Sequence, residues 1–141
     1  MKKQVILSIR GRQTYMEQAP EEIELVTEGV LEQTPEGWKL SYEESDLTGL
    51  QGVHTTFLAE PGKLTLSRTG RLASEMVFQE GVCHDSLYRM EFGTMLITVC
   101  ATRVQYTLDE QGGSVDLHYG IEVEQSAAGT IEYHLEVRVK E

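Results

Sequence analysis

The stretch "GGSVDLHYGIEVEQSAAGTIEYHLEVRVK", residues 112–140, alternates between apolar and polar side chains over most of its length. Its apolar positions fall in one phase: Val115, Leu117, Tyr119, Ile121 and Val123, then Ile131, Tyr133, Leu135, Val137 and Val139. The positions between them are mostly charged residues or histidines. A period of two residues is typical of a β-strand with one buried and one solvated face. The stretch therefore predicts two long antiparallel strands.

The same period recurs along the rest of the chain, and turn sequences separate the alternating runs. Val5, Leu7 and Ile9 share one phase, as do Trp38, Leu40 and Tyr42 in a later run. The predicted turns are "TPEG" before Trp38, "EPG" before Lys63, "EQGG" before Ser114 and "SAAG" before Thr130. Each lies between two alternating runs, as expected for a hairpin or a short loop.

Two details of register can also be predicted. A two-residue loop at Gln111 and Gly112 gives three apolar cross-strand pairs on one face: Leu108 with Val115, Tyr106 with Leu117, and Val104 with Tyr119. The apolar phase changes between Val99 and Val104, from odd to even positions. A bulge or corner near residues 101–103 would restore the alternation, and burial of both faces is the alternative.

The pattern as a whole predicts an all-β protein. It gives about ten strands with short connections, and no segment has a convincing helical period. An open sheet of this size would leave apolar edges exposed, whereas closure removes them. We therefore predict one domain over residues 1–141, a closed or nearly closed antiparallel up-and-down barrel. A two-sheet sandwich is the competing architecture.

Composition excludes several classes of function. The net charge is −11 and the pI is about 4.8, which disfavours binding to nucleic acid or to anionic membranes. The longest apolar runs are far shorter than a transmembrane helix needs, and the N-terminal "MKKQVILSIRGR" resembles a strand rather than a signal peptide. We therefore expect a cytoplasmic protein. Its two cysteines, Cys83 and Cys100, match no zinc spacing, and we expect them to be buried as small apolar residues.

Several stretches resemble the YwiB-like bacterial family of unknown function. They are "KLSYEES" at 39–45, "GKLTLSRTG" at 62–70, "MVFQEG" at 76–81, "YRMEFGTMLITV" at 88–99 and "GGSVDLHYGIEV" at 112–123. The resemblance covers nearly the whole chain and rests on strand and turn patterns, with unusual polar residues at Tyr42, Glu44, Arg68 and Tyr88. It implies a calycin-like or lipocalin-like β-barrel and a bacterial cytosolic setting, and it implies no activity.

One candidate site follows from a break in the apolar pattern of "KLTLSRTG", residues 63–70. Arg68 occupies the position that Leu64 and Leu66 predict to point inward, and Glu44 has the inward phase of Tyr42. A buried guanidinium requires an anionic or hydrogen-bonding partner. Three interpretations are open. Arg68 forms a structural pair with Glu44, reaches solvent at the strand end, or holds an acidic ligand with help from Tyr42 or Tyr88.

Other constellations are weaker. Trp38 is expected to pack in the core rather than stack on a ligand. His118 and His134, with Glu122 and Glu136, lie on the solvated faces of adjacent predicted strands, where histidines are usually solvated, so no metal site is predicted. No arrangement joins a nucleophile, a base and an oxyanion site, so we predict no catalytic residues and no cofactor.

Three functions remain. The first is a non-catalytic binding barrel for a small apolar or weakly acidic molecule, with Trp38, Tyr42, Glu44, Arg68 and Tyr88 as candidate ligand-binding residues. The second is a protein-interaction module with a filled interior and an acidic outer surface, and the third is an enzyme of unknown class. A cavity of about 300 Å³ or more with Arg68 and Glu44 at its wall would favour binding, whereas a filled interior would favour the module. The oligomeric state is left open.

Overall fold

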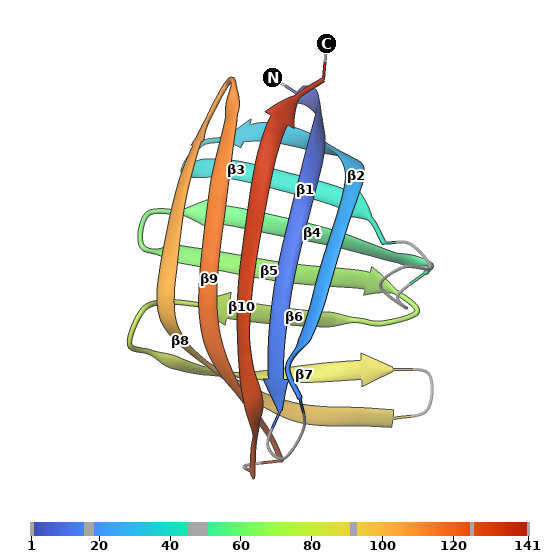
Figure 1. The fold of residues 1–141 in the computed structure, drawn as a ribbon, viewed down its shortest axis with the longest axis vertical. Coiled ribbons are helices and arrows are strands. Elements are labelled where there is room, and N and C mark those ends of the chain that lie inside the picture. Colours follow the sequence, from blue (N-terminus) through green and yellow to red (C-terminus); the bar gives the residue numbers. More distant parts are fainter. Residues whose placement is uncertain (1, 16–18, 45–50, 91–92, 125, 141) are drawn as a thin grey trace.

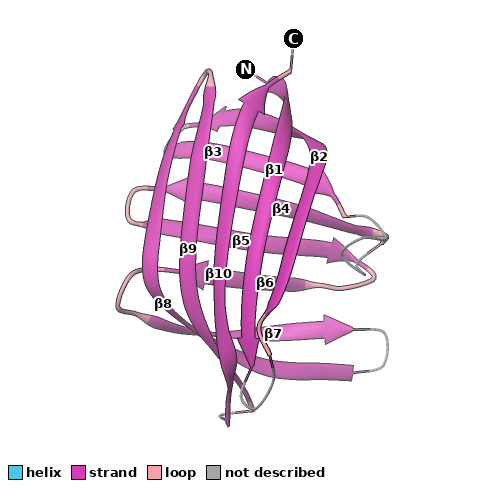
Figure 2. Ribbon diagram, viewed as in Figure 1, coloured by secondary structure: helices cyan, strands magenta, loops and turns pink. Residues whose placement is uncertain are grey.

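The fold is taken from a computed structural model, which describes residues 2–15, 19–44, 51–90, 93–124 and 126–140. Within these residues the secondary structure consists of ten strands and no helix (Figure 2). The strands are β1 (Lys2–Tyr15), β2 (Glu21–Thr34), β3 (Gly37–Glu43), β4 (Val53–Glu60), β5 (Lys63–Gly70), β6 (Ser74–Phe78), β7 (Cys83–Met90), β8 (Gly93–Asp109), β9 (Gly112–Val123) and β10 (Ser126–Val139). The described part of the chain contains no helix that could cross a membrane. The stretch "SDLTGLQGV", residues 45–53, could by its sequence carry one short helical turn at most, and residues 45–50 of it lie outside the described residues.

The strands form one nearly closed antiparallel barrel. Their spatial order is β6-β5-β4-β3-β2-β1-β10-β9-β8-β7, so strands consecutive in sequence pair with each other, except β6 and β7 at the two ends of the sheet, and β1 also pairs with β10. In Figure 1, β1, β2, β9, β10 and most of β8 run upright in front of β3 to β7, which cross behind them. The predicted up-and-down barrel is therefore confirmed, and the sandwich is not formed.

The barrel is incomplete between β6 and β7. In place of a continuous ladder, the two strands are joined by isolated bridges, Ala73 with Arg89 and Gln79 with Val82. The first bridge has two backbone hydrogen bonds, of 2.9 and 2.8 Å. The Ser86 hydroxyl adds a hydrogen bond to the carbonyl of Glu75. We call this junction the seam.

Side chains of the inward phase fill most of the interior. The largest that are fully buried come from every strand except β7: Val5, Leu7, Leu31, Leu40, Val53, Phe57, Leu64, Phe78, Val99, Val115, Leu117 and Leu135. Burying apolar surface of this kind is the main favourable term in folding. The interior is thus a packed core over most of its length, and free space is confined to particular places.

The phase change in β8 is a bulge, as predicted. The pairing of β8 with β9 shifts between Ala101 and Arg103. Ile97, Val99 and Ala101 are buried before the shift, and Val104, Tyr106 and Leu108 pack against the core after it. The bulge lets one long strand pair with β7 over its first half and remain in the barrel wall over its second half (Figure 1).

Two of the predicted turns are misplaced. The β8–β9 loop lies at Glu110 and Gln111, so Tyr106 pairs with Val115 and Val104 pairs with Leu117, two residues from the predicted register. The face is still correct, because a shift of two preserves side-chain direction. The "SAAG" sequence lies inside β10, where the pairing shifts between Ala127 and Gly129, and the hairpin turns before Ser126 instead. The "TPEG" and "EPG" turns are confirmed.

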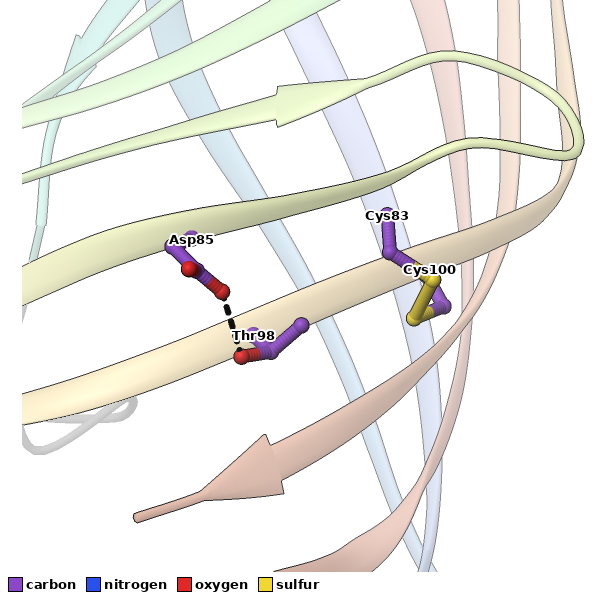
Figure 3. Close-up of a disulfide and its surroundings, with 4 residues drawn as sticks. All are labelled: Cys83, Asp85, Thr98 and Cys100. Atoms are coloured by element: carbon purple, nitrogen blue, oxygen red, sulfur yellow. Dashed lines mark hydrogen bonds between the residues drawn. A yellow bond between two sulfur atoms is a disulfide. The ribbon is translucent and has the colours of Figure 1, made fainter. Parts of the chain in front are cut away.

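The cysteines correct a third expectation. Cys83 of β7 and Cys100 of β8 lie directly opposite each other and form a disulfide (Figure 3). Cys83 is exposed, so neither its burial nor a free thiol is found. Thr98 donates a 2.7 Å hydrogen bond to Asp85 beside it (Figure 3). Disulfides persist mainly in oxidising compartments, which gives the cytoplasmic location no support, and that location stays a prediction.

Candidate functional site

A row of inward-facing polar residues crosses the strands near one end of the barrel. Arg68 of β5 lies opposite Thr55 of β4 on one side and opposite Ser74 of β6 on the other. Thr55 in turn lies opposite Tyr42 of β3. Antiparallel register thus places four polar side chains side by side on the inner surface, where the neighbouring rows are apolar.

Within the described structure, one donor of the Arg68 guanidinium lacks a hydrogen-bond partner. Its Nε atom is buried without a hydrogen-bond partner, and the same is true of the Ser74 hydroxyl. Among the described residues, no carboxylate forms an ion pair with Arg68, and Glu44 is not in salt-bridge contact with it. Leaving a buried charged donor unpaired is costly. The direct Arg68–Glu44 pair, one of the three interpretations of the sequence, is therefore not formed in the described structure.

Tyrosines surround Arg68. Burial lowers its pKa, but the hydroxyl groups of Tyr88, Tyr133, Tyr119 and Tyr42 outweigh this effect and raise the pKa above its ordinary value. The guanidinium therefore remains charged. The site is a cation inside an aromatic and hydroxyl-lined wall, an environment suited to holding an anion.

Glu44 is the acidic residue of the site. It follows β3, is 8% exposed, and its backbone N–H donates a 2.9 Å hydrogen bond to the carbonyl of Val53. Burial raises the pKa of its carboxyl group, while the charge of Arg68 and the hydroxyls of Tyr42 and Thr55 oppose that rise. Glu44 is thus partly stabilised by its neighbours without a direct ionic partner.

Arg68, Glu44 and Tyr42 border a cavity of about 110 Å³ inside this end of the barrel. Its other walls come from β1, β2 and β10: Ile9, Gly11, Gln13, Ile23, Leu25, Ile131 and Tyr133. Gly11 has the inward phase but no side chain. A Cβ atom built there would meet just one neighbour, the Tyr133 ring at 3.7 Å. Part of the cavity is therefore space that a side chain at position 11 would otherwise fill.

Arg68 also borders a groove on the other side of its strand, along the seam. This groove has a volume of about 550 Å³ and is lined from β5, β6 and β7, including Ser74, Ser86 and Arg89. Arg68 therefore lies at the wall of both the inner cavity and this groove.

The structure brings together four of the five residues named from sequence. Tyr42, Glu44 and Arg68 line the same cavity, and Tyr88 is near enough to Arg68 to raise its pKa. Trp38 lies near the opposite end of β3 and packs partly buried against the core, as expected. Sequence analysis missed Thr55, Ser74, Gly11 and Tyr133 as site residues. The register of β4, β5 and β6 would have pointed to the first two.

The histidines form a separate cluster on the outer face. Nδ1 of His134 lies 2.6 Å from Asp116 and its Nε2 lies 2.7 Å from Glu136. These two hydrogen bonds raise the pKa of His134 above its usual value. Among the described residues, no group of three or more histidine, cysteine or acidic side chains is arranged to hold a metal ion. His134 therefore serves as a partner for two carboxylates of the barrel wall.

Within the described residues, fold and site define a ten-stranded up-and-down barrel in which Arg68, whose Nε atom has no hydrogen-bond partner, lies beside a small cavity. The chain belongs to the family described as a domain of unknown function, DUF1934, whose model matches residues 7–135. It is similar to the solved crystal structure of the ywiB protein from Bacillus subtilis, with a TM-score of 0.80 and 23% sequence identity. That match covers 96% of this chain and 92% of the other, and it supports the fold. No curated protein matches the chain.

Proposed function

We propose that this protein is a binding barrel for a small molecule with an acidic group, which Arg68 holds inside the barrel. The observation that carries this proposal is the buried Nε atom of Arg68 without a hydrogen-bond partner. A carboxylate would supply the missing acceptor, since a guanidinium donates two parallel hydrogen bonds to it. The calycin-like assignment is part of this proposal, because calycins as a class often bind small ligands inside the barrel.

The cavity limits the ligand's size. Its volume of about 110 Å³ is below the roughly 300 Å³ that would favour binding of an ordinary small ligand, and less than the roughly 150 Å³ of an engineered cavity that accepts benzene. A long apolar ligand would not fit within it. The binding hypothesis is therefore narrowed from a small apolar or weakly acidic molecule to a small acidic one.

Native mass spectrometry and melting temperatures would test this function. Protein purified from cells is expected to retain a small acid, or its melting temperature is expected to rise with one member of a panel of small carboxylic acids. Arg68→Met should abolish the shift. A ligand-free mass together with no melting shift across the panel would overturn the proposal.

Two variants separate loss of the site from loss of the fold. Gly11→Ala places a methyl group in the cavity at ordinary contact distance from Tyr133, and alanine is favoured over glycine within a strand. It should therefore fold at least as well and bind more weakly. Arg10→Met is the matched control for Arg68→Met, because it makes the same substitution outside the cavity. Arg10 adjoins Gly11 in β1, and its side chain is 73% exposed on the outer face. Its binding should be unchanged.

A second function, a protein-interaction module, is favoured by the filled interior. Large buried side chains such as Phe57 and Phe78 occupy most of the barrel, which leaves little room for a ligand beyond the small cavity. The acidic outer surface would hold a basic partner. A pull-down should then return one protein that is released by raised salt, since salt screens surface charges.

A further inference from the structure

Arg68 and Glu44 form two poles of opposite charge at the wall of one cavity. Arg68 is on β5, whereas Glu44 follows β3, so β4 lies between them. Two strand spacings separate their backbones by about 10 Å. The two residues also lie at different positions along β4, because the backbone N–H of Glu44 bonds to Val53 while Arg68 lies opposite Thr55. The two side chains therefore approach the cavity from different places.

The two poles would accept different groups of one ligand. Arg68 offers hydrogen-bond donors and a positive charge, and its Nε atom has no acceptor. Glu44 offers carboxyl oxygens, which accept hydrogen bonds from an ammonium or hydroxyl group. A molecule with a carboxylate at one end and a donor close to it would contact both poles. A simple carboxylate would contact Arg68 alone.

We propose that the ligand is a short carboxylic acid carrying an amine or a hydroxyl group, its carboxylate on Arg68 and its donor group on Glu44. This inference rests on the proposed function. The small cavity requires that the two groups be close together in the ligand. Glycine at position 11 supports the arrangement, because it leaves space in the cavity wall beside Tyr133.

Three acids with one carbon skeleton provide the test. L-Alanine, L-lactate and propionate carry an amine, a hydroxyl and a hydrogen at the same carbon. Ligand-observed NMR titration would measure the Kd of each. We expect alanine or lactate to bind at least about tenfold more tightly than propionate, since a hydrogen bond to a charged group contributes that much. Whichever of the two binds more tightly identifies the donor group.

The variants assign each pole. With Glu44→Gln, the advantage over propionate should shrink severalfold while propionate binding stays unchanged. With Arg68→Met, all three acids should be lost. Arg10→Met should alter neither result. Circular dichroism melting would confirm that each variant is folded.

The results of these titrations distinguish the inference about Glu44 from the proposed binding of an acid by Arg68. If propionate binds as tightly as alanine and lactate, Glu44 is not a ligand pole, and the proposed binding of an acid by Arg68 stands. If the only acids of the panel that bind carry neither an amine nor a hydroxyl group, the inference is likewise overturned and the function again stands. If no acid of any kind binds, both are overturned.

Discussion

The hydroxyl group of Tyr42 lies 3.1 Å from the hydroxyl group of Tyr133, which joins β3 to β10 across two intervening strands. Tyr133 also packs on Phe57, with 5.9 Å between the ring centres. The contact thus ties together strands that do not share a ladder. It holds one wall of the cavity in place beside Glu44 and Arg68.

Removal of either hydroxyl should weaken the barrel modestly. Tyr42→Phe and Tyr133→Phe each retain the ring and lose the hydrogen bond, so each should lower the free energy of unfolding by about 1 kcal/mol. The double variant should cost little more than one single variant, because both remove the same contact. Urea denaturation of the four proteins measures this coupling. Fully additive losses would contradict an energetic link between the two hydroxyls.

The same tyrosines predict a loss of stability at alkaline pH. Burial raises the pKa of Tyr133 to about 12, and burial also raises the pKa of Tyr42. In the unfolded chain a tyrosine loses its proton near pH 10. Above that pH the unfolded state binds fewer protons than the folded state, so stability falls as pH rises. The slope from Tyr133 approaches about 1.4 kcal/mol per pH unit between the two pKa values.

Chemical denaturation between pH 9 and about 11.5 would measure that slope. Tyr133→Phe should flatten it, because the variant has no hydroxyl to titrate at this position. Tyr106→Phe is a suitable control, since Tyr106 is only partly buried at the edge of the core and does not line the cavity beside Tyr133. An unchanged slope in Tyr133→Phe would contradict the assignment.

The disulfide should stabilise the end of the barrel next to the seam. Cys83 and Cys100 are 17 residues apart, and closing a loop of this size contributes about 3 kcal/mol. Cys83→Ser with Cys100→Ser should therefore lower the free energy of unfolding by about this amount. Thr98→Val, which removes the neighbouring hydrogen bond to Asp85, should cost far less. A wild-type midpoint unaffected by a reducing agent would contradict the prediction.

The strands could be predicted from the sequence because apolar and polar side chains alternate along each one. The misplaced β8–β9 turn shows where such local information fails. Gly112 and Gly113 suggested a turn, yet they begin β9 with φ angles of 111° and 144°. A Cβ atom on Gly112 would lie 2.2 Å from the carbonyl oxygen of Val137. Glycine is required there by close approach of β10, which the sequence of the hairpin does not reveal.

The candidate site was likewise predicted only in part from the sequence. The inward direction of Arg68 and Glu44 followed from strand phase, but the distance between them depends on the strand that lies between β3 and β5. The cysteine pairing likewise depends on the register of β7 with β8. Spacing along the chain cannot supply either relationship. The sequence therefore could not show that Nε of Arg68 lacks a hydrogen-bond partner, the observation on which the proposed function rests.

Arg68→Met and Glu44→Gln together test whether the two residues form a buried structural pair or independent ligand contacts. Without an ion pair between them, Arg68→Met in the ligand-free protein should leave the free energy of unfolding unchanged within about 0.5 kcal/mol, or raise it, because an unpartnered buried cation is removed. Glu44→Gln should raise stability at neutral pH. The pKa of Glu44 is higher in the folded state, so its ionisation costs stability as pH rises above about 4.5.

Denaturant midpoints of the wild type, both single variants and the double variant give the coupling between these two residues. We expect it to stay below about 1 kcal/mol, since the charges interact only through their fields. The outer-face pair of Arg10 and Glu24, 4.0 Å apart and largely exposed, supplies the control cycle, which should show still less. A loss of about 3–5 kcal/mol in Arg68→Met that Glu44→Gln largely restores would instead identify a buried ion pair. That result would remove the unpartnered Arg68 donor on which the proposal of ligand binding rests.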